Sequence, residues 1–72
     1  MSISATLPRL RREARLTQQQ LAVRAGLTVS AIYKLEHGIC KPSLDSLQAL
    51  ARALGTNLDV LAGERREAQV VS

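Results

Sequence analysis

Residues that begin helices and residues that end them alternate along this chain at short intervals. Each starting residue is Thr, Ser or Asn, whose side chain can cap a helix, and each is followed by a glycine that can end the helix in a left-handed conformation. The predicted segments run from Thr17 to Gly26, Thr28 to Gly38, Ser43 to Gly55 and Asn57 to Gly63. No stretch has the alternation of apolar and polar residues that is typical of a strand. The chain is therefore predicted to be all-α.

A further helix is expected before these four, with less sharply defined ends. Pro8 should lie in its first turn, where a missing N–H does no harm, and Ser4, Thr6 or Leu7 could each precede it. Its inward side is predicted to be Leu7, Leu10 and Ala14. The whole prediction is a compact bundle of five helices over residues 1–63, followed by a flexible tail over residues 64–72.

The length and composition limit the chain to one small domain. A chain of 72 residues buries a modest core, and with Tyr33 as the only aromatic residue that core must be aliphatic. The apolar runs fall far short of the ~20 residues of a membrane span, and no secretory signal opens the chain, so a cytoplasmic protein is expected. One cysteine, Cys40, and one histidine, His37, exclude an internal disulfide and a four-ligand zinc site, and no metal or cofactor is predicted.

The net charge of +4 is unevenly distributed. The part from Met1 to Lys41 holds seven of the ten Lys and Arg residues and two of the six Asp and Glu residues. A basic half beside a near-neutral half fits a face that meets a polyanion, although it also fits a plain solvated surface. An enzyme is not predicted, because the chain lacks a phosphate-binding glycine loop, a useful pairing of cysteine and histidine, and clustered carboxylates.

The segment that ends at Gly26 and the segment that starts at Thr28 are separated only by Leu27. Two short helices joined so closely cannot form a long hairpin, so they are expected to cross steeply, as in a helix-turn-helix. The second helix then protrudes, and an α-helix fits the major groove of B-DNA with its N-terminal residues near the base edges. Such corners also occur in purely structural bundles.

The detailed pattern resembles the Cro/C1-type helix-turn-helix family of phage repressors and bacterial regulators over about Leu7 to Leu61. Caps, glycines, small residues and core aliphatics fall at that family's offsets in LTQQQLA at 16–22, AGLT at 25–28, IYKLEHG at 32–38, PS at 42–43 and LARALG at 50–55. The resemblance implies a lambda-repressor-like domain whose second and third helices form the helix-turn-helix. It also implies a transcriptional regulator, most simply a repressor, that binds double-stranded DNA in a sequence-specific manner.

The resemblance further implies which residues contact DNA. Gln18 matches a glutamine that contacts a phosphate and can buttress a base-reading side chain, and Thr17 could add a phosphate contact to its capping role. The residues matching groove-facing positions are Thr28, Val29, Ser30 and Lys34. The residues matching backbone contacts are His37, the loop from Ile39 to Lys41, where Lys41 is the natural phosphate partner, and Ser43; Tyr33 can add its hydroxyl.

The chemistry of three groove-facing side chains fits base contacts. Val29 can touch a thymine methyl, Ser30 can bond to several bases or to a phosphate, and Lys34 can reach O6 and N7 of guanine. Plainer interpretations stay open, since Gln18 and Lys34 could be solvated helix residues and His37 a polar residue near a helix end. The chain lacks the glutamines of other members at these positions, so no operator sequence is carried over.

Arg11 and Glu36 match a family pair that links the first helix to the third. Such a partly buried ion pair orients helices even where it adds little net stability. The remaining basic residues of the first helix, Arg9, Arg12 and Arg15, either extend the phosphate contacts or form a solvated face. Cys40 is interpreted as a loop residue rather than a redox switch.

A symmetric dimer on a palindromic operator is expected, because one recognition helix reads only a few base pairs. The predicted dimer surface is the last short helix, where Leu58, Val60 and Leu61 exceed what the core needs. The alternative function is an antitoxin that binds DNA and also a toxin protein, with residues 64–72 as a docking segment. A salt-dependent shift of duplex DNA favours the regulator, whereas co-purification with an unlike partner favours the antitoxin.

Overall fold

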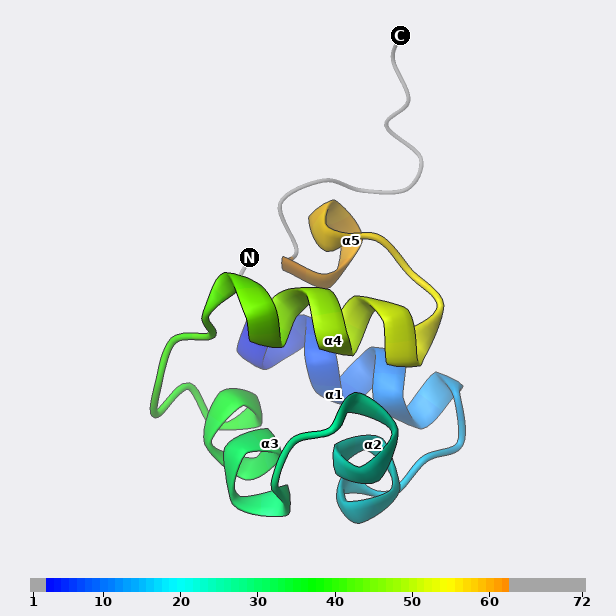
Figure 1. The fold of residues 1–72 in the computed structure, drawn as a ribbon, viewed down its shortest axis with the longest axis horizontal. Helices are drawn as coiled ribbons and strands as arrows, with labels where there is room; N and C mark the ends of the chain where they lie inside the picture. Colours follow the sequence, from blue (N-terminus) through cyan, green and yellow to red (C-terminus); the bar gives the residue numbers. More distant parts are fainter. Residues whose placement is uncertain (1–2, 63–72) are drawn as a thin grey trace, which may run out of the picture.

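The computed structural model describes residues 3–62, and within this range the chain forms helices and no strand (Figure 1). The helices are α1 (Ile3–Glu13), α2 (Gln18–Ala25), α3 (Val29–Glu36), α4 (Leu44–Leu54) and α5 (Leu58–Ala62). The first four have eight or eleven residues each, whereas α5 has five. The all-helical class is confirmed, and the described chain is a core of four helices with a short closing segment. The tail predicted over residues 64–72 lies outside the described residues.

Helices α2 to α5 begin where the capping residues predicted them to begin. Thr17 forms a complete capping box, because its Oγ1 accepts the Gln20 N–H at 3.0 Å and Gln20 Oε1 accepts the Thr17 N–H at 2.9 Å. At the start of each of the next three helices a side-chain oxygen likewise accepts a backbone N–H three residues later. These capping residues are Thr28, Ser43 and Asn57. These bonds satisfy backbone N–H groups that have no partner within the helix.

Each of the four longer helices is followed by a residue with left-handed backbone, at Arg15, Gly26, Gly38 and Gly55. The backbone N–H of the residue after it then donates to a carbonyl of the helix that has just ended. For α1, the Leu16 N–H donates to the Arg11 carbonyl at 3.1 Å. Arg15 is the one described residue other than glycine with a positive φ, at 61°. An L side chain is disfavoured there by about 1 kcal/mol, so the end of α1 has the least favourable terminator of the four.

The α1 helix differs from its prediction at both ends. It starts at Ile3, so Pro8 is its sixth residue and not part of the first turn. Proline removes one backbone hydrogen bond there, and the early turns are retained because Thr6 and Leu7 are buried and Ile3 packs against the core. Ala14, predicted to face inward, is exposed because it lies beyond the last helical residue.

The core is aliphatic, as the composition predicted. In Figure 1, α2 and α3 lie together at one end of the domain and α5 lies at the opposite end, beyond α4. Packing joins α2 to α3 and α4, and joins α1 to α3 and α5. The buried apolar side chains are Leu7, Leu16, Leu21, Ala22, Ile32, Leu35, Leu50, Ala51 and Leu61. None of the helices between residues 3 and 62 is long and apolar enough to cross a bilayer.

Leu61 lies in the core, so its predicted place on a dimer surface is wrong. Its side chain is 0% exposed and belongs to the buried cluster that also holds Leu7 and Leu50. The short helix α5 is rich in apolar residues because it packs against both α1 and α4. Leu58 and Val60 remain only partly exposed.

Candidate nucleic-acid interface

One face of α3 rests on the core and the other is open to solvent. Ile32 and Leu35 are buried, whereas Val29 and Tyr33 are 48% and 49% exposed. Ser30 and Lys34 are exposed on the same outward side. The outward side of α3 therefore presents apolar, hydroxyl and cationic groups together.

The residues before α2, α3 and α4 offer hydroxyl groups at exposed positions, but not equally. Thr17 and Thr28 each use their oxygen to accept a backbone N–H, which leaves the hydroxyl hydrogen to donate. Ser43 accepts the Ser46 N–H at 3.1 Å and also donates to Ser46 Oγ at 3.1 Å. The two threonines are therefore the freer donors toward an external anion.

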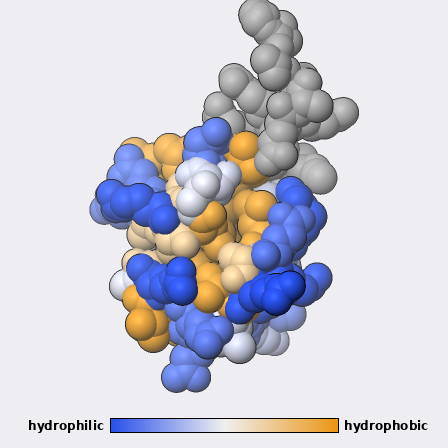
Figure 2. All heavy atoms as spheres, turned by 90° about the vertical axis from the view of Figure 1, so that its right-hand side faces the viewer, coloured by the Kyte–Doolittle hydropathy of each residue, from blue (hydrophilic) through white to orange (hydrophobic). Residues whose placement is uncertain are grey.

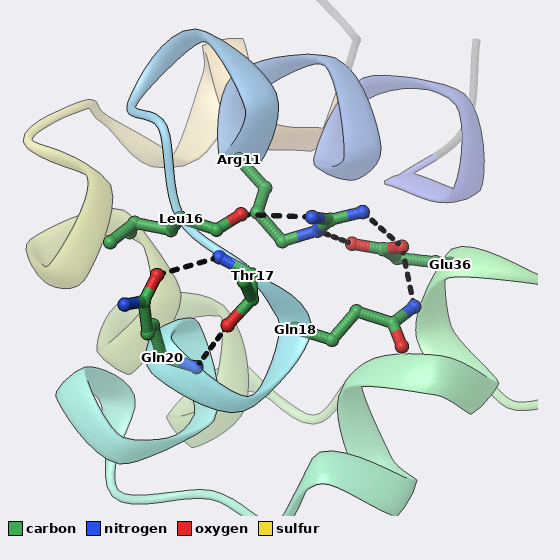
Figure 3. A network of polar contacts seen from close by, with 6 residues as sticks. All are labelled: Arg11, Leu16, Thr17, Gln18, Gln20 and Glu36. Carbon is green, nitrogen blue, oxygen red and sulfur yellow. Dashed lines mark hydrogen bonds and ion pairs between the residues drawn. The ribbon is translucent and has the colours of Figure 1, made fainter.

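A polar network joins the first three helices behind α3 (Figure 3). Arg11 Nε donates to Glu36 Oε2 at 2.6 Å and Arg11 Nη2 donates to Glu36 Oε1 at 3.2 Å, so the ion pair is bidentate. Arg11 Nη1 also donates to the Leu16 carbonyl at 2.9 Å, and Gln18 Nε2 donates to Glu36 Oε1 at 2.9 Å. The side chains of Arg11 and Glu36 are 14% and 5% exposed. The network fixes the start of α2 and the end of α3 against α1.

The Glu36 carboxyl is held in its charged form. Burial raises the pKa of Glu36. Hydrogen bonds from Arg11 and Gln18 and the charges of Arg11 and Arg12 lower the pKa by more than burial raises it, so the net pKa is below the ordinary value of 4.5. A carboxyl with a lowered pKa in the folded state stabilises the fold above its unfolded pKa. That stabilisation is lost as the pH falls through the folded pKa.

The bond from Gln18 to Glu36 is a contact that the sequence prediction missed. A charged carboxylate only accepts, so it fixes the amide of Gln18 with its nitrogen toward Glu36 and its oxygen pointing away (Figure 3). Local periodicity could not reveal a contact across so large a sequence separation. The ion pair of Arg11 with Glu36 was expected only through the family resemblance, and the structure contains it.

A family profile described as helix-turn-helix matches residues 9–61, which is most of the chain. This chain belongs to the helix-turn-helix family. The helix-turn-helix unit, defined here as α2, α3 and their connection, lies wholly within the matched region.

Similar proteins include two curated relatives and one solved structure. The chain is 38% identical over 64 residues to the immunity repressor protein of Bacillus phage phi105, covering 89% of this chain and 44% of that protein. It is 36% identical over 55 residues to an uncharacterised HTH-type transcriptional regulator of Sinorhizobium fredii, covering 76% of this chain and 71% of that one. The NMR structure of the DNA-binding domain of the P22 C2 repressor has a TM-score of 0.82 at 23% identity, covering 96% and 92% of the two chains, and this likeness concerns the fold.

Two further exposed features lie at the end of α3 and just after it. The rings of Tyr33 and His37 are in contact in a tilted arrangement, with centroids 4.0 Å apart and an angle of 46° between their planes. The segment after α3 then carries Cys40 and Lys41, both exposed. Within residues 3–62 no group of three or more His, Cys, Asp or Glu side chains is placed to hold a metal ion.

The residues predicted to contact DNA lie where a ligand can reach them. All are exposed except Gln18, which is half-buried beside Glu36. The exposed members are Thr17, Thr28, Val29, Ser30, Tyr33, Lys34, His37, Lys41 and Ser43. Of the other basic residues on α1, Arg9 pairs with Glu13 at 3.1 Å on the open surface, which favours the solvated face predicted as one alternative.

Proposed function

We propose that this helix-turn-helix domain binds double-stranded DNA in a sequence-specific manner and regulates transcription, most simply as a repressor. The observation that carries the proposal is the two-sidedness of α3, which buries Ile32 and Leu35 and exposes Val29, Ser30 and Lys34. An α-helix held in this way can enter the major groove. The proposed site of action is the nucleoid of the cytoplasm, where duplex DNA is found.

The side chains divide into two proposed roles. Val29, Ser30 and Lys34 read base edges, through a thymine methyl, a hydroxyl bond and guanine O6 and N7 respectively. The other predicted contacts position the domain on phosphates, which fixes its register without reading sequence. These positioning residues are Thr17, Gln18, Tyr33, His37, Lys41 and Ser43, whereas Thr28 faces the groove beside the base-reading residues.

Selection of bound duplexes from a random DNA pool tests the proposal directly. We expect an enriched motif of a few base pairs for one copy, repeated as an inverted pair if two copies bind. Enrichment of no motif, with binding that depends on salt alone, would show that the domain binds DNA without reading it. Absence of any duplex binding at low salt would remove the proposal.

Replacing Lys34 with alanine is expected to weaken binding to the selected site by about 1–3 kcal/mol and to relax preference at one base pair. The reason is that Lys34 is the one cation on the outward face of α3. Affinities for the selected site and for its single-base variants measure both effects. Arg24→Ala is the matched control, because it removes the same charge from an exposed position on α2. An equal loss on every sequence would contradict the base-reading role of Lys34.

Replacing Lys41 with alanine is expected to weaken binding to all sequences and to reduce the slope of log affinity against log salt by about one unit. Lys41 lies exposed beyond α3 and is proposed to neutralise a phosphate. Titrations at several salt concentrations on selected and unrelated duplexes provide the measurement. An unchanged slope would show that Lys41 makes no phosphate contact.

A further inference from the structure

Val23, on α2, is the most exposed of the large apolar side chains that the structure describes, at 75%. Figure 2 views this side of the molecule, with the connection from α1 to α2 and the end of α4, and shows apolar area among hydrophilic side chains. A single exposed apolar side chain is ordinary on a protein surface. The shape and the charge of the surface around Val23 therefore decide whether it can bind a partner.

Three shallow hollows follow one another across this face. The first, of about 500 Å³, lies along α2, and the second, of about 400 Å³, lies between α2 and α4. The third, of about 420 Å³, lies between the end of α4 and the start of α5. Val23 and Arg24 line both the first and the second hollow, and Arg52 lines both the second and the third. The hollows therefore adjoin, and the row that they form is called here the α2–α4 groove.

The middle of the α2–α4 groove is lined largely by small residues. Besides Val23 and the two arginines, the second hollow is lined by Ala25, Gly26, Ala49 and Ala53. Small side chains leave room for the side chains of a bound segment. An apolar side chain placed there would cover Val23 and remove it from water.

The charge of the α2–α4 groove is positive and unpaired. Arg24 and Arg52 are exposed, and neither forms an ion pair or a side-chain hydrogen bond among the residues that the structure describes. No acidic residue is among the described side chains that line the three hollows. A guanidinium group pairs well with a carboxylate, because its planar N–H groups match the two oxygens. The groove is therefore complementary to an occupant that carries carboxylates.

We propose that the α2–α4 groove binds an acidic segment of another protein, with an apolar side chain over Val23 and carboxylates on Arg24 and Arg52. This binding goes beyond the proposed function, since it needs no DNA. Of the proposed DNA contacts, only Thr17 lines the groove, and none of the outward residues of α3 does. The domain can therefore hold a duplex and the acidic segment at the same time.

A single nucleic-acid strand is the other polyanion that two arginines could attract. Sites for single strands combine cations with aromatic side chains on which the bases stack. No aromatic residue is among the described side chains of the groove, whereas an exposed apolar side chain lies beside the two cations. Grooves of this kind suit amphipathic peptide segments. The observations therefore favour an acidic protein segment over a nucleic acid.

Selection from a displayed library of short random peptides on the immobilised domain tests the proposal without DNA. We expect the enriched peptides to share carboxylates beside a large apolar residue. A fluorescent peptide of the enriched sequence then serves as the probe for affinity. Its binding should weaken by about tenfold or more in Arg24→Gln with Arg52→Gln. It should weaken by about fivefold in Val23→Asn, which removes the apolar contact.

The matched control is Lys34→Gln with Lys41→Gln, which removes the same charge from the proposed DNA-binding face. This control should keep the affinity of the parent for the peptide and lose affinity for the selected duplex. The variant Arg24→Gln with Arg52→Gln should show the reverse, with the base preferences of the parent retained. Circular dichroism checks that every variant is folded.

Each outcome supports or overturns the groove as a protein-binding site. Enrichment of no acidic sequence would overturn it, and so would equal loss of peptide affinity in the two double variants, since net charge alone would then attract the peptide. An oligothymidylate strand that outcompetes the peptide for the same two arginines would assign the groove to nucleic acid instead. Failure of the parent to bind duplex DNA would remove the proposed DNA-binding function and leave the peptide result unaffected.

Discussion

Replacing Arg11 with alanine is expected to lower the free energy of unfolding at neutral pH by about 3–5 kcal/mol. The change leaves the Glu36 carboxylate, 5% exposed, with Gln18 as its remaining side-chain hydrogen-bond partner. It also removes the bond from Arg11 to the Leu16 carbonyl, which holds the connection to α2. Urea unfolding followed by circular dichroism measures the loss.

A charge-free pair separates the electrostatic cost from the packing cost. Arg11→Met combined with Glu36→Met keeps two bulky side chains and removes both buried charges, and such replacements are often neutral or stabilising. The double variant should therefore be clearly more stable than Arg11→Ala. Equal instability of the two variants would mean that the packing of α1 against α3, and not the charge of Glu36, accounts for the effect.

The pH dependence provides an independent check of the same prediction. In the parent the lowered pKa of Glu36 contributes stability above 4.5, and the contribution is lost as the pH falls through the folded pKa. Without Arg11, the effect of burial on this pKa loses its main opposition, so the carboxyl protonates more readily. The stability gap between parent and Arg11→Ala should therefore narrow as the pH falls below 4.5. A gap that stays constant with pH would contradict the role assigned to Glu36.

Replacing Leu61 with aspartate is expected to cost about 4 kcal/mol or more, because it places an unpaired charge at a position that is 0% exposed. A loss of that size is most of the stability of a small domain. The measurement is the helical circular dichroism signal with its thermal transition. We expect the variant to be largely unfolded, whereas Val60→Asp on the same short helix should remain folded. A folded Leu61→Asp protein would show that α5 does not close the core.

The parts of the fold that depend on local chemistry could be predicted from the sequence. The starts of α2, α3 and α4 follow from a hydroxyl side chain followed by a free N–H three residues later, and the structure places these bonds at Thr17, Thr28 and Ser43. The ends of these helices follow from glycines in the left-handed conformation. Both signals involve residues close together in the chain.

The parts that depend on packing could not be predicted in the same way. The start of α1 at Ile3 is favoured by burial of Thr6 and Leu7, which outweighs the preference of Pro8 for a first turn. Its end is formed by Arg15 in a conformation usually left to glycine, so no sequence signal marks it. Leu61 was predicted to lie on a dimer surface and not in the core, because the space that it fills is formed by helices distant in the sequence.

The candidate site shows the same division. Helical periodicity predicted the outward face of α3, and Val29, Ser30 and Lys34 are exposed there. The bond that orients Gln18 joins two helices through Glu36 and has no signature in residue spacing. The DNA sequence that the proposed site would select depends on contacts that no pattern within the chain encodes.

The outward face of α3 is energetically separate from the scaffold that holds it. Ser30 and Lys34 form no side-chain hydrogen bond or ion pair within residues 3–62, whereas Arg11, Gln18 and Glu36 tie the helix to its neighbours from behind. Substitutions at Ser30 and Lys34 are therefore expected to leave the contacts that hold α3 in place unchanged. Under the proposed function, a change of DNA sequence preference would need substitutions only at Val29, Ser30 and Lys34, because the hydrogen bonds of Arg11 and Gln18 to Glu36 hold α3 independently of those side chains.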